Sequence, residues 1–223
     1  ITLAKEILIL IDADKSIYDS IGDKHAVLDE YCESVRHIIS GEKVEVPCDK
    51  LIDVLNGMSD WIGNHIRNTE WLSDKDGYSW FNGYYDNSGK AVEGDFETGV
   101  RMMLTGQVFA IMSETATKEQ VAEIAKAADK YLYDEKIGGY RLNTNFNEVK
   151  TDLGRLFGFA FGHKENGAVF SHMAVMYANA LYSRGFAKEG YKVINTLYKH
   201  CNDYNLSNIY PGVPEYVNQR GQG

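Results

Sequence analysis

One short stretch of the chain, GHKENGAVFSH ending at His172, concentrates side chains that could bind a polar ligand. Lys164 donates hydrogen bonds, an ionised Glu165 accepts them, and Asn166 does both, which matches the mixed edges of a sugar ring. His172 adds a donor that titrates near neutral pH. The stretch therefore indicates a pocket for sugar hydroxyls and an oxyanion. The alternative is a polar loop leading into a helix that begins near Ala168, with His172 as a core histidine.

The composition is that of an acidic globular protein. A chain of 223 residues with 44% apolar content can build one large domain or two small ones. A net charge of -9 with scattered Lys and Arg argues against a nucleic-acid or anionic-membrane surface. Neither a membrane span nor a signal peptide is evident, which predicts a cytoplasmic protein. The 3 cysteines lack CxxC spacing and indicate reduced thiols, which argues against a zinc site. The sequence also shows no metal-ligand cluster and no nucleotide-binding loop, so no metal or cofactor is expected.

Hydrophobic periodicity predicts a mainly helical chain. Residues 3–18 are apolar enough for a buried helix, although the ILILI run also fits a strand. Helical spacing recurs over residues 24–40 and again after Pro47, which suits a first helical turn. Thr117 and Gln120 have the spacing of a capping box. The remaining helices are expected at about 100–112, 117–132, 168–182 and 187–200.

Two long polar stretches separate these helices. Residues 73–99 are rich in Gly and aromatic side chains and predict a structured loop or a short hairpin, and residues 134–166 are again polar and Gly-rich. Long loops in compact domains are functional or disordered, and the aromatic density argues against disorder. About seven helices in pairs predict an α/α toroid or barrel whose long loops gather at one rim. A helical bundle or solenoid is the alternative.

Four motifs occur in order between about Asp76 and the C-terminus. They are WFNGYYDNSG from Trp80, GGYRLNTNF from Gly138, KENGAVFSH from Lys164 and YPGVPEY from Tyr210. Together they resemble the catalytic domain of the inverting glycoside phosphorylases, the family of cellobiose phosphorylase, chitobiose phosphorylase and 1,2-β-oligoglucan phosphorylase, with the cyclic β-1,2-glucan synthase phosphorylase module beside them. The resemblance implies an all-α (α/α)6 barrel, with residues 1–223 forming a single catalytic-domain segment from the later part of that barrel.

The reaction implied by the resemblance is phosphorolysis. Inorganic phosphate attacks the anomeric carbon of a β-glucoside with inversion and yields α-glucose 1-phosphate and a shortened sugar. Since phosphate replaces the water of an inverting hydrolase, one carboxylic acid that protonates the leaving oxygen is sufficient. Phosphate enters as a substrate, so the resemblance implies no cofactor.

Residue roles follow from the matching motifs. His172 resembles the phosphate-binding histidine of the family, and Lys164 resembles the lysine that binds the sugar in the donor subsite. Glu165 is its neighbour in the same subsite. Gln219 corresponds to a donor-subsite glutamine, with a spacing that also leaves Asn218 open.

The first motif implies further cleft residues and a substrate. Trp80, Tyr85 and Asp86 lie in the loop that lines the sugar-binding cleft in this family, with local packing as the alternative. Cellobiose phosphorylase-like sequences have Arg and Ala where this chain has Gly83 and Tyr84. The NGYYDN form resembles the 1,2-β-oligoglucan phosphorylases more closely, which implies a short β-1,2-glucan.

Two parts of the family's active site have no match in this sequence. A general-acid Asp in a motif such as WNDG is not found, and Asp60 beside Trp61 has neighbours that do not fit it. A TGSASW segment that contacts phosphate would follow the final RGQG. The resemblance therefore implies a piece of a longer enzyme that needs the rest of its polypeptide or a homo-oligomer.

Three alternatives stay open at the level of the sequence. One is a non-catalytic carbohydrate-binding helical domain, and another is a cellobiose-type phosphorylase or hydrolase of the same fold. A plain α-helical interaction domain is the third, and the polar loops argue against it.

Overall fold

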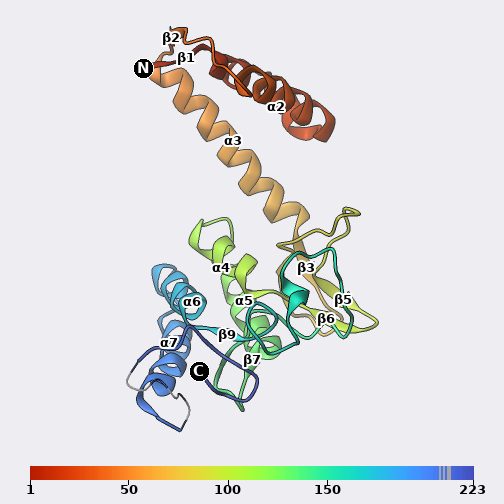
Figure 1. Cartoon of the computed structure of the whole chain (residues 1–223), viewed down its shortest axis with the longest axis vertical. Helices are drawn as coiled ribbons and strands as arrows, with labels where there is room; N and C mark the ends of the chain where they lie inside the picture. Colours follow the sequence, from red (N-terminus) through yellow and green to blue (C-terminus); the bar gives the residue numbers. More distant parts are fainter. Residues whose placement is uncertain (206, 208, 210–211) are drawn as a thin grey trace. The chain divides into compact units, whose positions relative to one another are not determined.

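The structure is a computed structural model that describes residues 1–205, 207, 209 and 212–223 (Figure 1). The chain divides into two compact units, residues 1–65 and 66–223, and the division falls within helix α3 (Cys48–Thr69). Within the described residues there are seven α-helices and five two-stranded antiparallel sheets. The predicted helical fold is thus confirmed. Tyr210 and Pro211 of the fourth motif lie outside the described residues.

The first unit opens with a strand and not with a helix. Strand β1 (Thr2–Ala4) pairs antiparallel with β2 (Lys43–Glu45). The Asp14 carboxylate then accepts a hydrogen bond from the Ser16 N–H at 2.8 Å and starts a separate 3-10 turn. The prediction of one helix over residues 3–18 is therefore wrong. The segments between the strands are η1 (Lys5–Ile7), α1 (Leu8–Ile11), η2 (Lys15–Asp19) and α2 (Ile21–Val35).

Helix α2 is shorter than its apolar pattern predicts. It begins after the cap Ser20 and ends at Val35, before the predicted end at residue 40. The Glu6 carboxylate accepts hydrogen bonds from the Ser40 N–H at 2.9 Å and from its hydroxyl at 2.6 Å, which holds the chain away from the helical path. Ile38 consequently lies 86% exposed. Helix α3 follows where Pro47 predicts a helix start.

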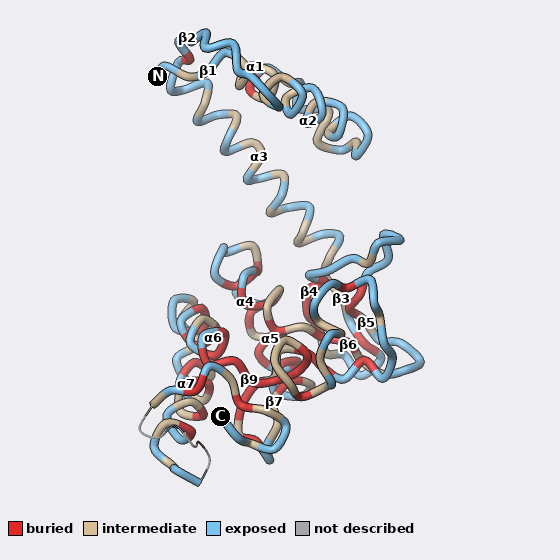
Figure 2. The backbone as a smooth tube through the Cα atoms, in the orientation of Figure 1, coloured by how far each residue is buried: buried red, intermediate tan, exposed pale blue. Residues whose placement is uncertain are grey.

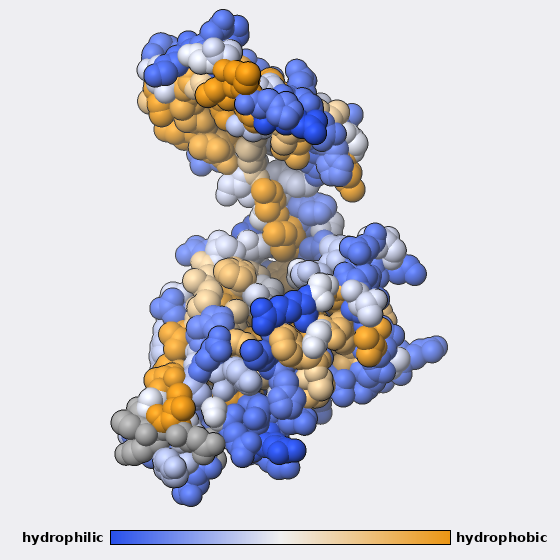
Figure 3. Space-filling view, viewed as in Figure 1, coloured by the Kyte–Doolittle hydropathy of each residue, from blue (hydrophilic) through white to orange (hydrophobic). Residues whose placement is uncertain are grey.

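The first unit buries little apolar surface. In the described part of the chain its buried hydrophobic residues are Ile11 and Val46. Many other apolar side chains of this unit reach the surface, as the orange atoms of its visible face show (Figure 3). The exposed ones on α2 and α3 include Ile21, Leu28, Ile52, Leu55 and Ile62. Exposed apolar surface of this extent is typical of a face that packs against another chain segment or molecule.

The second unit begins with two hairpins in the segment predicted as a loop or short hairpin. Strand β3 (Trp71–Ser73) pairs with β4 (Ser79–Phe81), and β5 (Gly94–Phe96) pairs with β6 (Gly99–Arg101). Because β6 is held in a ladder, helix α4 (Leu104–Met112) begins four residues later than the predicted helix start at residue 100.

Four helices build the core of the second unit. The capping box of α5 (Lys118–Tyr131) is confirmed, since the Gln120 N–H donates to the Thr117 hydroxyl at 3.2 Å and the Thr117 N–H donates to the Gln120 side chain at 3.0 Å. A short turn with Gly185 at φ 84° joins α6 (Ser171–Ser183) to α7 (Ala187–Asn202). Burial concentrates on these helices and on β4 (Figure 2). Fully buried core side chains include Trp80, Leu104, Ile111, Ile124, Tyr177 and Leu181.

One further hairpin, one long-range strand pair and a 3-10 helix complete the second unit. Strand β7 (Tyr133–Asp134) pairs with β8 (Gly139–Tyr140), and β9 (Val169–Phe170) pairs with β10 (Tyr216–Val217). The 3-10 helix η3 (Leu156–Gly158) lies in the long polar segment. No described helix of either unit is long and apolar enough to cross a membrane.

Candidate functional site

The KENG sequence forms the tip of a tight hairpin in the second unit. The Gly162 N–H donates to the Asn166 carbonyl at 2.6 Å, and the Asn166 N–H donates to the His163 carbonyl at 3.1 Å. Lys164 has a left-handed backbone with φ 45°, between Gly162 at 86° and Gly167 at 76°. The hairpin therefore presents Lys164 and its neighbour Glu165 together at its tip.

The pairing of β9 with β10 brings the third and fourth motifs side by side. Val169 lies opposite Val217, and the ladder continues as the Gln219 N–H donates to the Gly162 carbonyl at 2.9 Å. A Cβ placed on Gly162 would collide with the Cβ of Gln219. The backbone of Gln219 thus lies directly against the hairpin that carries Lys164.

Glu165 has one oxygen that the described residues leave unpaired. Its Oε1 lies 3.1 Å from the Arg155 Nε, while its Oε2 is buried and has no hydrogen-bond partner among the described residues. Lys164 Nζ lies 5.6 Å from the Phe159 ring centroid. A buried acceptor without a donor is costly, so this oxygen suits a hydroxyl donor from a ligand.

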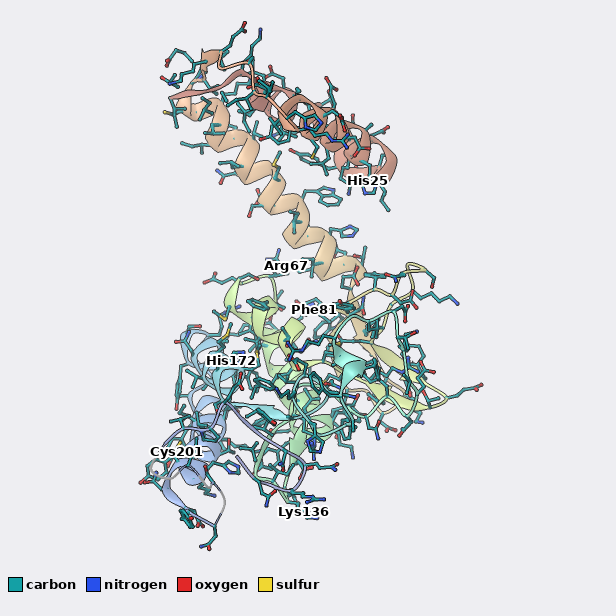
Figure 4. The ribbon with its side chains drawn as sticks, in the orientation of Figure 1. His25, Arg67, Phe81, Lys136, His172 and Cys201 are labelled. Carbon is teal, nitrogen blue, oxygen red and sulfur yellow. The ribbon has the colours of Figure 1, made fainter. Side chains whose placement is uncertain are left out.

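His172 is exposed near the start of α6 (Figure 4), which overturns its interpretation as a core histidine. The helix begins at Ser171 and not near Ala168, because β9 keeps the preceding residues in a strand. The imidazole packs edge-on against Phe170 at 5.4 Å. It also lines a pocket of about 330 Å³ with Glu215 of the fourth motif. Its ring is therefore accessible to a small ligand.

The turn that follows β10 distinguishes Asn218 from Gln219 as candidate ligand-binding residues. The Asn218 side-chain oxygen accepts hydrogen bonds from the N–H of Arg220 at 2.8 Å and of Gln222 at 3.3 Å, which commits it to the turn. Gln219 is exposed beside the hairpin. Gln219 is consequently the better placed of the two for a ligand.

The three predicted cleft residues of the first motif differ in their surroundings. Trp80 is 0% exposed on β4 and packs against Tyr131 at 5.8 Å, so this structure offers no ring surface of Trp80 to a sugar. Tyr85 is 50% exposed, and its hydroxyl donates to the Glu70 carboxylate at 2.7 Å. Tyr85 is thus the aromatic member of this set that a ligand can reach.

Asp86 organises its own loop. Its carboxylate accepts hydrogen bonds from the Ser88 hydroxyl at 2.6 Å and from the Lys90 N–H at 3.0 Å, and these bonds lower the pKa of Asp86. Lys150 lies 3.3 Å from the same carboxylate. Arg155, five residues after Lys150, pairs with Glu165. The segment that contains Lys150 and Arg155 therefore contacts both Asp86 of the first motif and the KENG hairpin.

A buried carboxyl group near this loop was not predicted from the sequence. Glu93 is 2% exposed and accepts hydrogen bonds from the Gly83 N–H at 2.9 Å and the Met103 N–H at 2.7 Å. Burial raises the pKa of Glu93 to about 8, although the two N–H donors partly oppose the shift. Its partners lie ten residues away on either side, so no local pattern announces its burial.

Glu93 also lines a pocket of about 800 Å³ with Glu70, Tyr84 and Tyr85. Tyr84 and Met103 continue into a smaller pocket beside Leu153. Within the described residues, no three His, Cys, Asp or Glu side chains are grouped to hold a metal ion. The site thus consists of polar loops, aromatic side chains and partly or fully exposed cations on a helical framework.

A comparison with known families identifies the class of this mainly helical domain. The sequence model of the glycosyl hydrolase 94 superfamily, catalytic domain, matches residues 48–215. The chain belongs to this family, and the resemblance to the inverting glycoside phosphorylases is confirmed. The matched range includes Lys164, Glu165 and His172 and ends before Gln219.

Two characterised relatives are phosphorylases. The chain is 26% identical over 208 residues to solabiose phosphorylase of Paenibacillus borealis, which covers 89% of this chain and 25% of that protein. It is 28% identical over 85 residues to cellobionic acid phosphorylase of Neurospora crassa, covering 38% of this chain and 11% of that protein. The chain thus spans about a quarter of the length of the first relative and a smaller share of the second.

The solved structures that match this chain are more distant from it in sequence than the two phosphorylases. The GH63 mannosylglycerate hydrolase of Thermus thermophilus, in its complex with Tris, has a TM-score of 0.45 and 14% sequence identity, and the match covers 94% of this chain and 40% of that one. An uncharacterized conserved protein of the same organism gives the same TM-score and identity over 41% of its chain.

Proposed function

We propose that the protein carrying this chain is an inverting phosphorylase that cleaves a β-glucoside with inorganic phosphate. The observation that supports it is the ladder of β9 and β10, extended by the bond between Gln219 and Gly162. Through this ladder the hairpin of Lys164 and Glu165 adjoins Gln219, and His172 is the second residue after β9. Residues expected to bind sugar and phosphate therefore share one edge of the second unit.

Each group has a chemical role in the proposed reaction. Lys164 and Gln219 donate hydrogen bonds to hydroxyl oxygens of the donor sugar, and the free oxygen of Glu165 accepts one from a sugar hydroxyl. His172 donates to a phosphate oxygen as the dianion approaches the anomeric carbon. A C–O bond to phosphate forms while the glycosidic C–O bond breaks, and a general acid outside the assigned residues protonates the leaving oxygen.

The substrate we favour is a short β-1,2-glucan. Gly83 and Tyr84 replace the Arg and Ala of cellobiose phosphorylase-like sequences, and Tyr84 lines both neighbouring pockets. Tyr85 provides an accessible aromatic face for a sugar ring. Trp80 and Asp86 support the loop from within, in place of the direct sugar contact expected for them.

The same proposal extends to architecture and surroundings. We place residues 1–223 in a single (α/α)6-barrel catalytic domain of a cytoplasmic enzyme that uses phosphate as substrate and no cofactor. The exposed apolar face of the first unit supports a covering partner, either the remaining polypeptide or a second copy of the protein.

The test uses the complete protein with phosphate and a panel of sugars. Sophorose-type β-1,2-oligosaccharides, cellobiose, solabiose and cellobionic acid are incubated separately, and the released sugar phosphate is identified by phosphorus and proton NMR. We expect α-glucose 1-phosphate from the β-1,2-oligosaccharides only when phosphate is present.

Other outcomes discriminate among the alternatives. Sugar release without phosphate would indicate a hydrolase, and phosphorolysis of another member of the panel would correct the substrate alone. Sugar binding in calorimetry without any cleavage would indicate a non-catalytic carbohydrate-binding domain.

A further inference from the structure

We propose that Asn143 is a positioning residue that holds the KENG hairpin in its ligand-binding conformation by acting through Asn166. The inference rests on the proposed function, because it names how Lys164 and Glu165 are held for the sugar. Asn143 belongs to the GGYRLNTNF motif, which none of the proposed catalytic or binding roles uses.

The amide of Asn143 is fully engaged in a buried position. It is 1% exposed, and its side-chain oxygen accepts a hydrogen bond from the Gly167 N–H at 2.8 Å. Its amide nitrogen donates to the Asn166 side-chain oxygen at 3.2 Å and to the Thr144 carbonyl at 2.9 Å. One side chain therefore contacts the backbone and a side chain of the hairpin at once.

Asn166 passes this contact across the hairpin. It is 5% exposed, and its amide nitrogen donates to the Phe159 carbonyl at 2.9 Å. Its backbone carbonyl accepts from the Gly162 N–H at 2.6 Å. The pair Asn143–Asn166 thus joins both arms of the hairpin, and Lys164 and Glu165 lie in the tip between the two arms.

A second contact fixes the base of the hairpin from another element. The Arg141 guanidinium donates to the Gly167 carbonyl at 2.6 Å and to the Asp134 carboxylate at 2.8 Å. Gly167 is consequently held at both its N–H and its carbonyl by residues two positions apart in the same motif. Asn143 is also anchored, since it forms an antiparallel bridge with Met103.

The backbone of Lys164 shows why such a brace is required. A left-handed conformation at φ 45° is unfavourable for a residue with a side chain, and it persists where neighbouring contacts fix it. Removal of the Asn143 amide would leave the Gly167 N–H and the Asn166 oxygen without their buried partner. The hairpin would then relax, and Lys164 and Glu165 would lose their shared orientation.

The test compares Asn143→Ala, Asn166→Ala and the double variant in the complete protein, with Asn145→Ala as the matched control. Asn145 is exposed in the same motif, and within the described part of the chain its side chain bonds only to the nearby Asn147 N–H. We expect Asn143→Ala to raise KM for the sugar at least about tenfold with KM for phosphate within about threefold. The double variant should lose less than the sum of the two single variants, because both single variants remove the shared Asn143–Asn166 hydrogen bond.

Hydrogen–deuterium exchange without ligand supplies a readout that is independent of activity. Amides of residues 159–168 should exchange faster in Asn143→Ala and remain unchanged in Asn145→Ala. Unchanged exchange, or equal increases in both KM values in a folded variant, would overturn the positioning role. If the wild-type protein cleaves no sugar, the proposed function fails by itself. In that case, hydrogen–deuterium exchange and calorimetric measurement of glucose binding test the positioning role of Asn143. A glucose affinity of Asn143→Ala that is less than tenfold below that of the wild type would overturn this role.

Discussion

Two carboxylates of the second unit show how the surroundings of a residue separate a structural role from a binding role. Asp86 accepts hydrogen bonds from Ser88 and Lys90 within its own turn, and these bonds lower its pKa. Glu165 has Arg155 on one oxygen and leaves the other oxygen buried without a partner among the described residues. A ligand hydroxyl can satisfy the second carboxylate, whereas the first is already satisfied by the protein.

The proposed role of His172 leads to a prediction that separates the two substrates. In the complete protein, His172→Ala should raise KM for phosphate about tenfold or more and change KM for the sugar little, because the donor that is lost is the one proposed to bind phosphate. Steady-state kinetics with each substrate varied at saturating levels of the other measures this split. His25→Ala, at an exposed position of the first unit, is the control and should change neither constant. Equal losses for both substrates would contradict the assignment.

The raised pKa of Glu93 predicts a pH dependence of stability. Its pKa rises from 4.5 in the unfolded chain to about 8 in the fold, so the folded state retains a proton that the unfolded state loses. The contribution of Glu93 to the unfolding free energy is therefore fully present below pH 4.5. It declines by up to about 1.4 kcal/mol per pH unit above that pH and is lost as the pH rises through 8.

Urea unfolding of Glu93→Gln at several pH values between 5.5 and 8 tests this dependence. The difference in unfolding free energy between wild type and variant should change with pH, because Gln does not titrate. Glu97→Gln removes an exposed carboxylate of the same loop and should give a difference that stays constant. A pH-independent difference for Glu93→Gln would show that its carboxyl group titrates at an ordinary pH.

At the scale of elements, the sequence predicts structure where contacts are local. The capping box of Thr117 and Gln120 and the apolar stripe of α3 are local signals, and both elements form as predicted. The Glu6–Ser40 contact, which diverts the chain after α2, joins residues that lie far apart in the sequence. Strand β6 delays the start of α4 because it pairs with β5 in a short hairpin, which competes with the apolar helical pattern of the same residues.

The same distinction applies to the candidate site. Lys164, Glu165 and His172 could be proposed from one continuous motif. Asn143 and Glu93 could not, because their importance arises from partners that only the fold brings close. Trp80 has the residue type of a sugar platform, and its burial in β4 becomes visible only in the structure.

The contact between the hairpin and the segment after β10 predicts a specific effect of one added methyl group. Gly162→Ala should weaken sugar binding, because the new Cβ would collide with Gln219 and because φ 86° is unfavourable for Ala. Gly185→Ala is the matched control, with φ 84° and no atom within 4 Å of the added Cβ. It should lower the unfolding free energy by about 1 kcal/mol and leave KM for the sugar unchanged. Equal kinetic effects of the two variants would contradict the proposed juxtaposition.

At the scale of the whole molecule, apolar burial is distributed unevenly between the two units. Ile11 and Val46 are the buried hydrophobic residues of the first unit among the described positions, while the second unit has a continuous core across α4, α5, α6 and α7. An amide exchanges when the structure around it opens, and the free energy of this opening depends on the contacts that are lost. The two units should therefore differ strongly in protection.

Hydrogen–deuterium exchange of the chain measures this difference directly. Amides of α2, which has no buried residue, should exchange at least about a hundredfold faster than amides of α5, where Val121, Ile124 and Ala128 are buried. Ile124→Ala should accelerate exchange in α5 and leave α2 unchanged, because the cavity lies in the core of the second unit alone. Protection of α2 equal to that of α5 would mean that its exposed apolar face is covered in solution, and the loss of that protection on dilution would identify a second copy as the cover.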